Sequence, residues 1–180
     1  MARLLARLLL ALALFSGGAQ ANHHSASAYA LLARSPATPA PLSLTPQQHQ
    51  WLESRHELVL GTSAPDYPPF DITSGGRDYQ GLTAEYANLI GLALQLPVRV
   101  LRFSNRQAAV EALKRGDIDL LGSANGYEAT TDGLALSHPY AVDQPVLVTR
   151  ENEGRALDMG LEDMRLGMLY HYLPTSCLGR

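Results

Sequence analysis

The stretch that decides the fold is TAEYANLIGLALQLPVRVLRFSNRQAAVEALKRGDIDLLGS, residues 83–123. Its first part has apolar residues at spacings of three and four, which predicts an amphipathic helix with one face turned inward. The residues of that predicted face are Tyr86, Leu89, Ile90, Ala93 and Leu94. Pro97 ends the pattern, and VRVLRF, residues 98–103, then alternates as a strand does.

The second part of the stretch predicts another helix and another strand. Ser104 and Gln107 have the spacing of a capping box, and Gly116 suits the left-handed end of a helix. We expect Ala109, Ala112 and Leu113 to face inward between those two ends. IDLLGS, residues 118–123, is short and apolar, as a buried strand is.

Upstream of this stretch, the same alternation of elements continues. Thr45, Pro46 and Gln48 predict a helix start with a capping box and proline in the first turn. ELVLGTS, residues 57–63, then reads as a buried strand. Strands alternating with helices predict an α/β fold with a parallel sheet flanked by helices. Further strands are expected in GLALSHPY (133–140), QPVLVTR (144–150) and RLGMLY (165–170).

Three loops follow the predicted parallel strands, and a ligand site is expected where they meet. In an open parallel sheet, ligands bind beyond the carboxyl ends of the strands, where loops and helix amino termini converge. The loops are APDYPPF (64–70), SNR (104–106) and GSANGYE (122–128). The sequence therefore predicts a binding mouth built from these segments.

The first loop contains two consecutive prolines, Pro68 and Pro69, which restrict its backbone. A stiff loop holds Tyr67 at a low entropic cost on binding, and its ring can stack on a small polar molecule. For Phe70, packing in the core beneath the loop is the first interpretation, and contact with the ligand is the alternative that makes it a candidate site residue.

The other two loops supply polar candidates. Ser123 and Asn125 can hydrogen-bond a ligand, or they can simply form local turns. Tyr127 lies in the same loop and completes the expected ligand-binding set with Arg106. Arg106 sits in the first turn of a helix, where a cation is mildly disfavoured, so a merely solvated side chain is its alternative.

Composition excludes several classes of function. The 180 residues carry 14 Lys and Arg against 17 Asp and Glu, so the chain has no basic footprint for nucleic acid. The single cysteine, Cys177, cannot form an internal disulfide. No nucleophile with a base, metal cluster or phosphate loop is evident, so we expect a binding module without cofactor or metal, and not an enzyme.

The amino-terminal residues predict export. MARLLARLLLALALFSGGAQA, residues 1–21, has two arginines, a short apolar run and small residues at its end, as a cleaved secretory signal does. Residues 22–44 are rich in Ala, Ser and Pro and lack apolar periodicity, so we expect a flexible lead.

Four segments together resemble the bacterial extracellular solute-binding proteins of family 3, the Venus-flytrap type. They are LVLGTSAPDYPPFD (58–71), YQGLTAEYANLIGLAL (79–94), AVEALKRGDIDLLGS (109–123) and LALSHPYAVDQPVLVTR (134–150). Residues 44–71 and RLGMLYHYLP (165–174) are most similar to the first periplasmic domain of hybrid sensor histidine kinases of the Bvg and Evg type.

The resemblance implies a periplasmic-binding-protein-like fold of two lobes that close on a small ligand. Residues 45–145 would form lobe one, residues 146–174 the hinge strand and the start of lobe two, and residues 175–180 a tail. Tyr67 matches the family's ligand-stacking aromatic, and Ser123 and Asn125 fall in the cleft loop. The segment YEATTDG (127–133) lacks the arginine that grips an amino-acid carboxylate in many members.

The resemblance implies a truncated periplasmic sensor domain that binds a small polar solute and signals to kinase modules by closing. A solute-binding protein of an ABC transporter for amino acids or related molecules is the alternative. The inner membrane would be reached only through parts beyond this chain.

Overall fold

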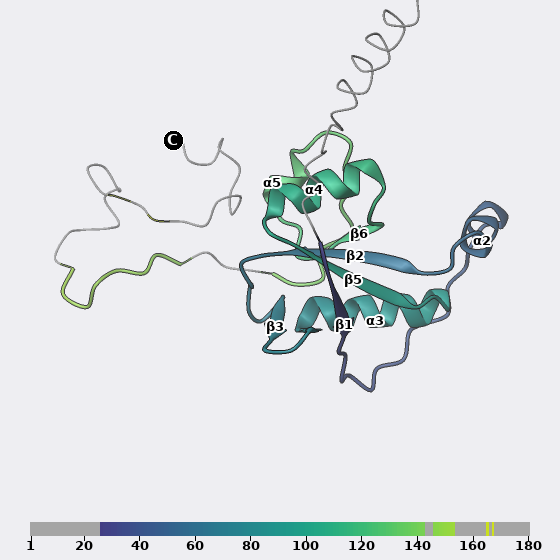
Figure 1. The fold of residues 1–180 in the computed structure, drawn as a ribbon, viewed down its shortest axis with the longest axis horizontal. Helices are drawn as coiled ribbons and strands as arrows, with labels where there is room; N and C mark the ends of the chain where they lie inside the picture. Colours follow the sequence, from purple (N-terminus) through teal and green to yellow (C-terminus); the bar gives the residue numbers. More distant parts are fainter. Residues whose placement is uncertain (1–25, 143–145, 154–164, 166, 168–180) are drawn as a thin grey trace, which may run out of the picture.

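The computed structural model describes residues 26–142, 146–153, 165 and 167, and its main body is a six-stranded mixed sheet with helices on both faces (Figure 1). The strands are β1 (Ser27–Leu31), β2 (Leu58–Ser63), β3 (Ile72–Ser74), β4 (Asp78–Gln80), β5 (Val98–Phe103) and β6 (Leu120–Leu121). The helices are α2 (Pro46–Glu53), α3 (Leu82–Leu94), α4 (Arg106–Arg115) and α5 (Gly126–Ala129). The strand order is β3-β4-β1-β5-β2-β6.

The parallel centre of the sheet confirms the fold class predicted from the sequence. β2 pairs in parallel with β5 on one side and with β6 on the other, so that Leu60 lies beside both Val100 and Leu120. Figure 1 shows α4 and α5 over one face of this sheet and α3 over the other. The loops that follow β2, β5 and β6 therefore leave the sheet at one edge.

Two apolar clusters hold the layers together, because successive side chains of a strand point to opposite faces. Val59 and Phe103 pack with Ala109 of α4 on one face. Leu60 and Val100 pack with α3 on the other face, together with Tyr79, Ala84 and Ala87.

The buried face of α3 differs from the predicted one. The buried positions are Thr83, Ala84, Ala87 and Gly91, whereas Tyr86 and Ile90 are 41% and 39% exposed. A Cβ added at Gly91 would lie 2.7 Å from Val98 Cγ2, so small residues let the helix approach the sheet closely. The periodicity was right for a helix, but close packing selects the small side chains and turns the larger ones outward.

The ends of α2 and α4 show which capping residues the chain uses. In α2 the predicted capping box is confirmed: Thr45 Oγ1 accepts from Gln48 N–H, and Gln48 Oε1 accepts from Thr45 N–H. In α4 the cap is Asn105 and not Ser104, because the extended backbone of Asn105 places its Oδ1 2.9 Å from Ala108 N. Gly116 ends α4 in the left-handed conformation, as predicted.

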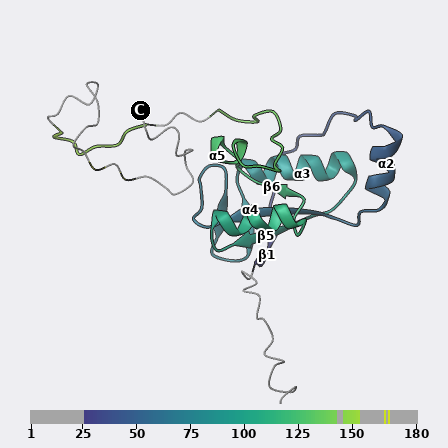
Figure 2. The same ribbon diagram turned by 90° about the horizontal axis from the view of Figure 1, so that it is seen from above.

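The predicted flexible lead, residues 22–44, is wrong for Ser27–Leu31. This segment forms β1, which pairs antiparallel with β5 and parallel with β4. The prediction from composition was wrong because composition indicates only whether side chains can be buried. The side chains of β1 are mostly exposed, and backbone hydrogen bonds hold this strand in the sheet. Figure 2 shows the same strand beside β5 from a second direction.

The strands predicted downstream of α5 are absent from the residues that the structure describes there. Residues 133–140 and 146–150 have no strand pairing. Val146 and Val148 are 79% and 85% exposed, and none of the described strands pairs with this segment. RLGMLY lies outside the described residues apart from Arg165 and Gly167, and residues 1–21 lie outside them entirely.

No helix among the described residues is long and apolar enough to cross a membrane.

The pairing of β1 leads to a stability prediction. The Ala30→Pro variant removes the N–H that donates to Arg77 O at 2.6 Å, and should lower the free energy of unfolding by about 1–2 kcal/mol. Ala40→Pro is the control, because Ala40 is exposed and lies in no strand, and should change it by less than about 0.5 kcal/mol. Urea unfolding followed by Trp51 fluorescence measures both. Equal stability of the two variants would show that β1 does not support the fold.

Candidate functional site

A cavity of about 800 Å³ opens where the loops after β2 and β6 meet. Tyr67, Phe70, Ser123 and Asn125 all line it, so the structure brings four of the six predicted ligand residues to one place. Tyr127 lies on α5 between Gly126 and Glu128, which both line the cavity. Arg106 is the exception, because it does not line the cavity.

The loop after β2 presents two aromatic rings together. The rings of Tyr67 and Phe70 stack with centroids 5.3 Å apart and 17° between their planes. The loop is folded back on itself: Tyr67 N donates to Asp71 O at 2.8 Å, and Phe70 N donates to Tyr67 O at 2.8 Å. Phe70 is partly buried and also lines the cavity, so its ring is placed both to pack beneath the loop and to face a ligand.

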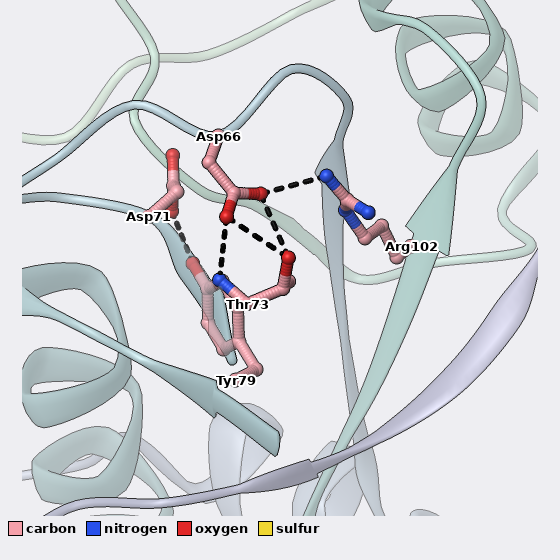
Figure 3. A network of polar contacts seen from close by, with 5 residues as sticks. All are labelled: Asp66, Asp71, Thr73, Tyr79 and Arg102. Carbon is pink, nitrogen blue, oxygen red and sulfur yellow. Dashed lines mark hydrogen bonds and ion pairs between the residues drawn. The ribbon is translucent and has the colours of Figure 1, made fainter. Parts of the chain in front are cut away.

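Polar side chains hold this loop in place through Asp66, as Figure 3 shows. Asp66 accepts from Arg102 Nη2 at 2.7 Å, from Thr73 N at 2.8 Å and from Thr73 Oγ1 at 2.9 Å. Asp66 and Arg102 are only 29% and 22% exposed, so solvent screens their attraction less than at an open surface. The ion pair thus ties the aromatic loop to the end of β5.

The same view contains a second polar pair, Asp71 and Tyr79, and both of these residues are buried (Figure 3). Tyr79 is fully buried, and its hydroxyl donates to the carboxylate of Asp71. Burial, and then the negative charge of Asp71, hold the pKa of Tyr79 well above its ordinary value. Tyr79 therefore remains a neutral donor, which fixes Asp71 at the end of the aromatic loop.

Arg106 braces the loop after β6. Its Nε donates to Glu128 Oε1 at 2.7 Å, its Nη1 to Gly122 O at 2.8 Å and its Nη2 to Ser123 O at 3.2 Å. Its side chain is 16% exposed and that of Glu128 is 1% exposed. The structure thus places the guanidinium behind the loop, against a buried carboxylate. The two expectations for Arg106, a solvated side chain or a residue that contacts the ligand, are therefore both corrected.

Glu128 is the residue that sequence reasoning missed in this loop. Its second oxygen accepts from Asn125 N at 2.8 Å, so one carboxylate holds both the loop and Arg106. The signal was present, because a glutamate three residues after an asparagine has the spacing of a capping pair at a helix start.

Hydroxyl groups from three segments meet beside the aromatic rings. Ser123 adopts a positive φ of 51°, and its Oγ lies 2.9 Å from Thr83 Oγ1. Thr83 Oγ1 is also 3.1 Å from the hydroxyl of Tyr140, which lines the cavity. Sequence reasoning missed Thr83 and Tyr140, since neither belongs to a loop after a parallel strand.

Within the described ranges, no group of three or more His, Cys, Asp or Glu side chains could hold a metal ion. The arrangement instead offers stacked rings, hydroxyls and an amide, which suit reversible binding of a small polar molecule.

The brace of Arg106 leads to a prediction. Glu128→Gln leaves the mostly buried guanidinium without its counter-charge, and should destabilise the chain by about 2–4 kcal/mol. Asp117→Asn is the matched control, because Asp117 forms an exposed pair with Arg115, and should cost less than about 0.5 kcal/mol. Chemical unfolding of both variants measures the difference, and equal losses would contradict a buried brace.

Comparisons with known proteins agree with this geometry. A family model for bacterial extracellular solute-binding proteins, family 3, matches residues 58–166. The virulence sensor protein BvgS of Bordetella bronchiseptica is 43% identical over 137 residues, which cover 76% of this chain and 11% of BvgS. The sensor protein EvgS of Escherichia coli O157:H7 is 25% identical over 139 residues, covering 77% of this chain and 12% of EvgS.

A solved structure shows the same likeness. The crystal structure of the B. pertussis BvgS periplasmic domain matches with a TM-score of 0.60 and 38% identity, over 64% of this chain and 22% of that one. The chain spans about a tenth of the length of the sensor proteins that it matches. Because the family model covers more than half of the chain, including β2, β5, β6 and the cavity beside the loops after β2 and β6, this chain belongs to the bacterial extracellular solute-binding proteins of family 3.

Proposed function

We propose that this chain is part of a periplasmic ligand-sensing flytrap domain that binds a small polar solute and signals to kinase modules of a longer sensor protein. The observation that carries the proposal is the convergence of Tyr67, Phe70, Ser123 and Asn125 on one cavity. The sequence likeness to two sensor proteins supports it, and favours a sensor over the solute-binding protein of a transporter.

The cavity residues have complementary roles in this proposal. The stacked pair of Tyr67 and Phe70 offers an aromatic surface for the flat face of a solute. Ser123 and Asn125 provide hydrogen bonds to the solute. Arg106 supports the loop through Glu128 and does not grip the ligand itself.

Binding would act on the sensor by shifting a conformational equilibrium. A solute that contacts both this lobe and a second lobe stabilises the closed arrangement relative to the open one. The size of this stabilisation equals the difference between the solute's binding free energies for the two arrangements. A segment with exposed Val146 and Val148 follows the cavity-lining residues and is the proposed hinge strand. The proposed export signal, residues 1–21, would deliver the domain to the periplasm.

A chimera tests this function. Residues 44–174 replace the matching stretch of B. pertussis BvgS, and kinase autophosphorylation is measured in membrane vesicles. We expect the chimera to retain phosphorylation, and Tyr67→Ala to change its level severalfold because the stacking surface of the cavity is lost.

Trp51→Ala in the same chimera is the control. Trp51 is an exposed aromatic residue on α2 that contacts Arg55 and does not line the cavity, so its removal should leave phosphorylation unchanged. Equal effects of the two variants would exclude the cavity as the sensing site.

A further inference from the structure

The first turn of α3 carries a residue that contacts three segments lining the cavity, although it does not line the cavity itself. These segments are loop 64–70 after β2, loop 122–128 after β6, and residues 133–141, which we call the strap. The residue is Thr83, which is only 4% exposed. Its contacts use the backbone N–H, the hydroxyl and the methyl group, so a single residue joins the three segments.

The backbone of this turn holds the loop after β2. A helix begins with N–H groups that have no partner within the helix, and no side chain caps the start of α3. The loop supplies the missing acceptors. Leu82 N donates to Pro69 O at 3.0 Å. Thr83 N donates to Phe70 O at 3.1 Å. The loop that carries the stacked aromatic rings is therefore held against the start of α3.

The hydroxyl of Thr83 joins the other two segments. Its Oγ1 lies 2.9 Å from Ser123 Oγ in the loop after β6 and 3.1 Å from Tyr140 Oη in the strap. A hydroxyl has one proton and two lone pairs, so it can take part in both hydrogen bonds whichever atom donates in each. The link between the loop and the strap therefore depends on the presence of this oxygen and not on the direction of any proton.

The methyl group of Thr83 packs beneath the loop after β6. A Cβ added at Gly122 would lie 2.7 Å from Thr83 Cγ2, closer than two carbon atoms can approach. Because Gly122 has no side chain, the loop comes near enough for the adjacent Ser123 to reach the hydroxyl of Thr83.

Tyr140 is held on α3 by a second residue as well. Its ring packs against that of Tyr86, with centroids 4.7 Å apart and 40° between the planes. Tyr86 Oη also donates to Tyr140 O at 3.4 Å. Thr83 and Tyr86 are three residues apart and are therefore neighbours on the helix surface. Together they hold the hydroxyl, the ring and the backbone of Tyr140.

We propose that Thr83 is a positioning residue of the binding site, which holds the strap and the two loops around the ligand without contacting the ligand itself. This inference rests on the proposed function, because it concerns the cavity that the proposed solute occupies. A residue of this kind lowers the entropic cost of binding, since the wall is already in place when the solute arrives.

The strap is the segment that depends most on Thr83. Ion pairs also hold the two loops, through Glu128 in one loop and Asp66 in the other. The strap meets α3 through Tyr140. Loss of the Thr83 hydroxyl should therefore loosen the strap, while the two loops stay in place.

Two substitutions of the same residue test this placement. Thr83→Val removes the hydroxyl but keeps a branched side chain and the backbone N–H, whereas Thr83→Ser keeps the hydroxyl. Backbone order parameters of the isotopically labelled chain are measured by NMR relaxation. We expect the strap to be rigid in the unmodified chain and in Thr83→Ser, and its order parameters to fall below about 0.6 in Thr83→Val. Those of β2 and β5 should stay unchanged, which would show that the sheet is intact.

A third variant removes the same contact from its other side. Tyr140→Phe loses the hydroxyl that meets Thr83 but keeps the ring that packs on Tyr86. It should loosen the strap as Thr83→Val does. The double variant should loosen the strap no further than Thr83→Val alone, because both substitutions remove one and the same hydrogen bond to the strap.

The chimera with B. pertussis BvgS tests the consequence for signalling. Thr83→Val should change kinase autophosphorylation severalfold, in the same direction as Tyr67→Ala. The reason is that the strap both lines the cavity and leads to the proposed hinge strand. Thr83→Ser should restore the phosphorylation of the unmodified chimera, because the bridging oxygen is present again.

The outcomes separate this proposal from the proposed function. A strap that stays rigid in Thr83→Val, or that loosens equally in Thr83→Ser, would overturn the role of the hydroxyl and leave the cavity as the sensing site. Unchanged phosphorylation in Thr83→Val, with a changed level in Tyr67→Ala, would overturn the positioning role alone. Unchanged phosphorylation in both variants would overturn both proposals.

Discussion

The parallel pairing of β2 with β5 on one side and β6 on the other is the constraint on which the structure depends. Parallel strands end at the same edge of a sheet, so the loops after these strands emerge together. Both faces of such a sheet need cover, and the chain provides it because Val59 faces α4 while Leu60 faces α3. The cavity exists because this pairing brings loops 64–70 and 122–128 to one place.

The site itself depends on polar groups that are buried or partly buried. Asp66 with Arg102, Asp71 with Tyr79, and Glu128 with Arg106 each tie a cavity loop to the body of the domain. Such pairs are strong in a low dielectric and costly to break singly, so they hold the loops in one arrangement. If the cavity binds a ligand as proposed, loops held in this way would lose little further conformational entropy on binding.

Local sequence signals predicted the positions of helices and strands well, but predicted the buried face of a helix less well. Some predicted features depend only on neighbouring residues, and the structure contains all of them. They are the capping box of Thr45 and Gln48, the left-handed Gly116 and the strand 98–103. The inward face of α3 depends on how near the helix lies to the sheet, and Gly91 decides that. The strand Ser27–Leu31 depends on partners far away in the sequence, so its composition alone indicated no order.

The sequence by itself determined the parallel α/β order and which loops would share an edge, because hydrophobic spacing and turn residues act over a few neighbours. It also predicted that Tyr67, Phe70, Ser123 and Asn125 lie near one another, since each lies in a loop after a parallel strand, and all four line one cavity. Only the tertiary structure decided that Arg106 braces the loop through Glu128, and that Thr83 joins Ser123 to Tyr140. Those contacts join residues 22 to 57 positions apart in the sequence, so they follow from three-dimensional packing and not from local sequence patterns.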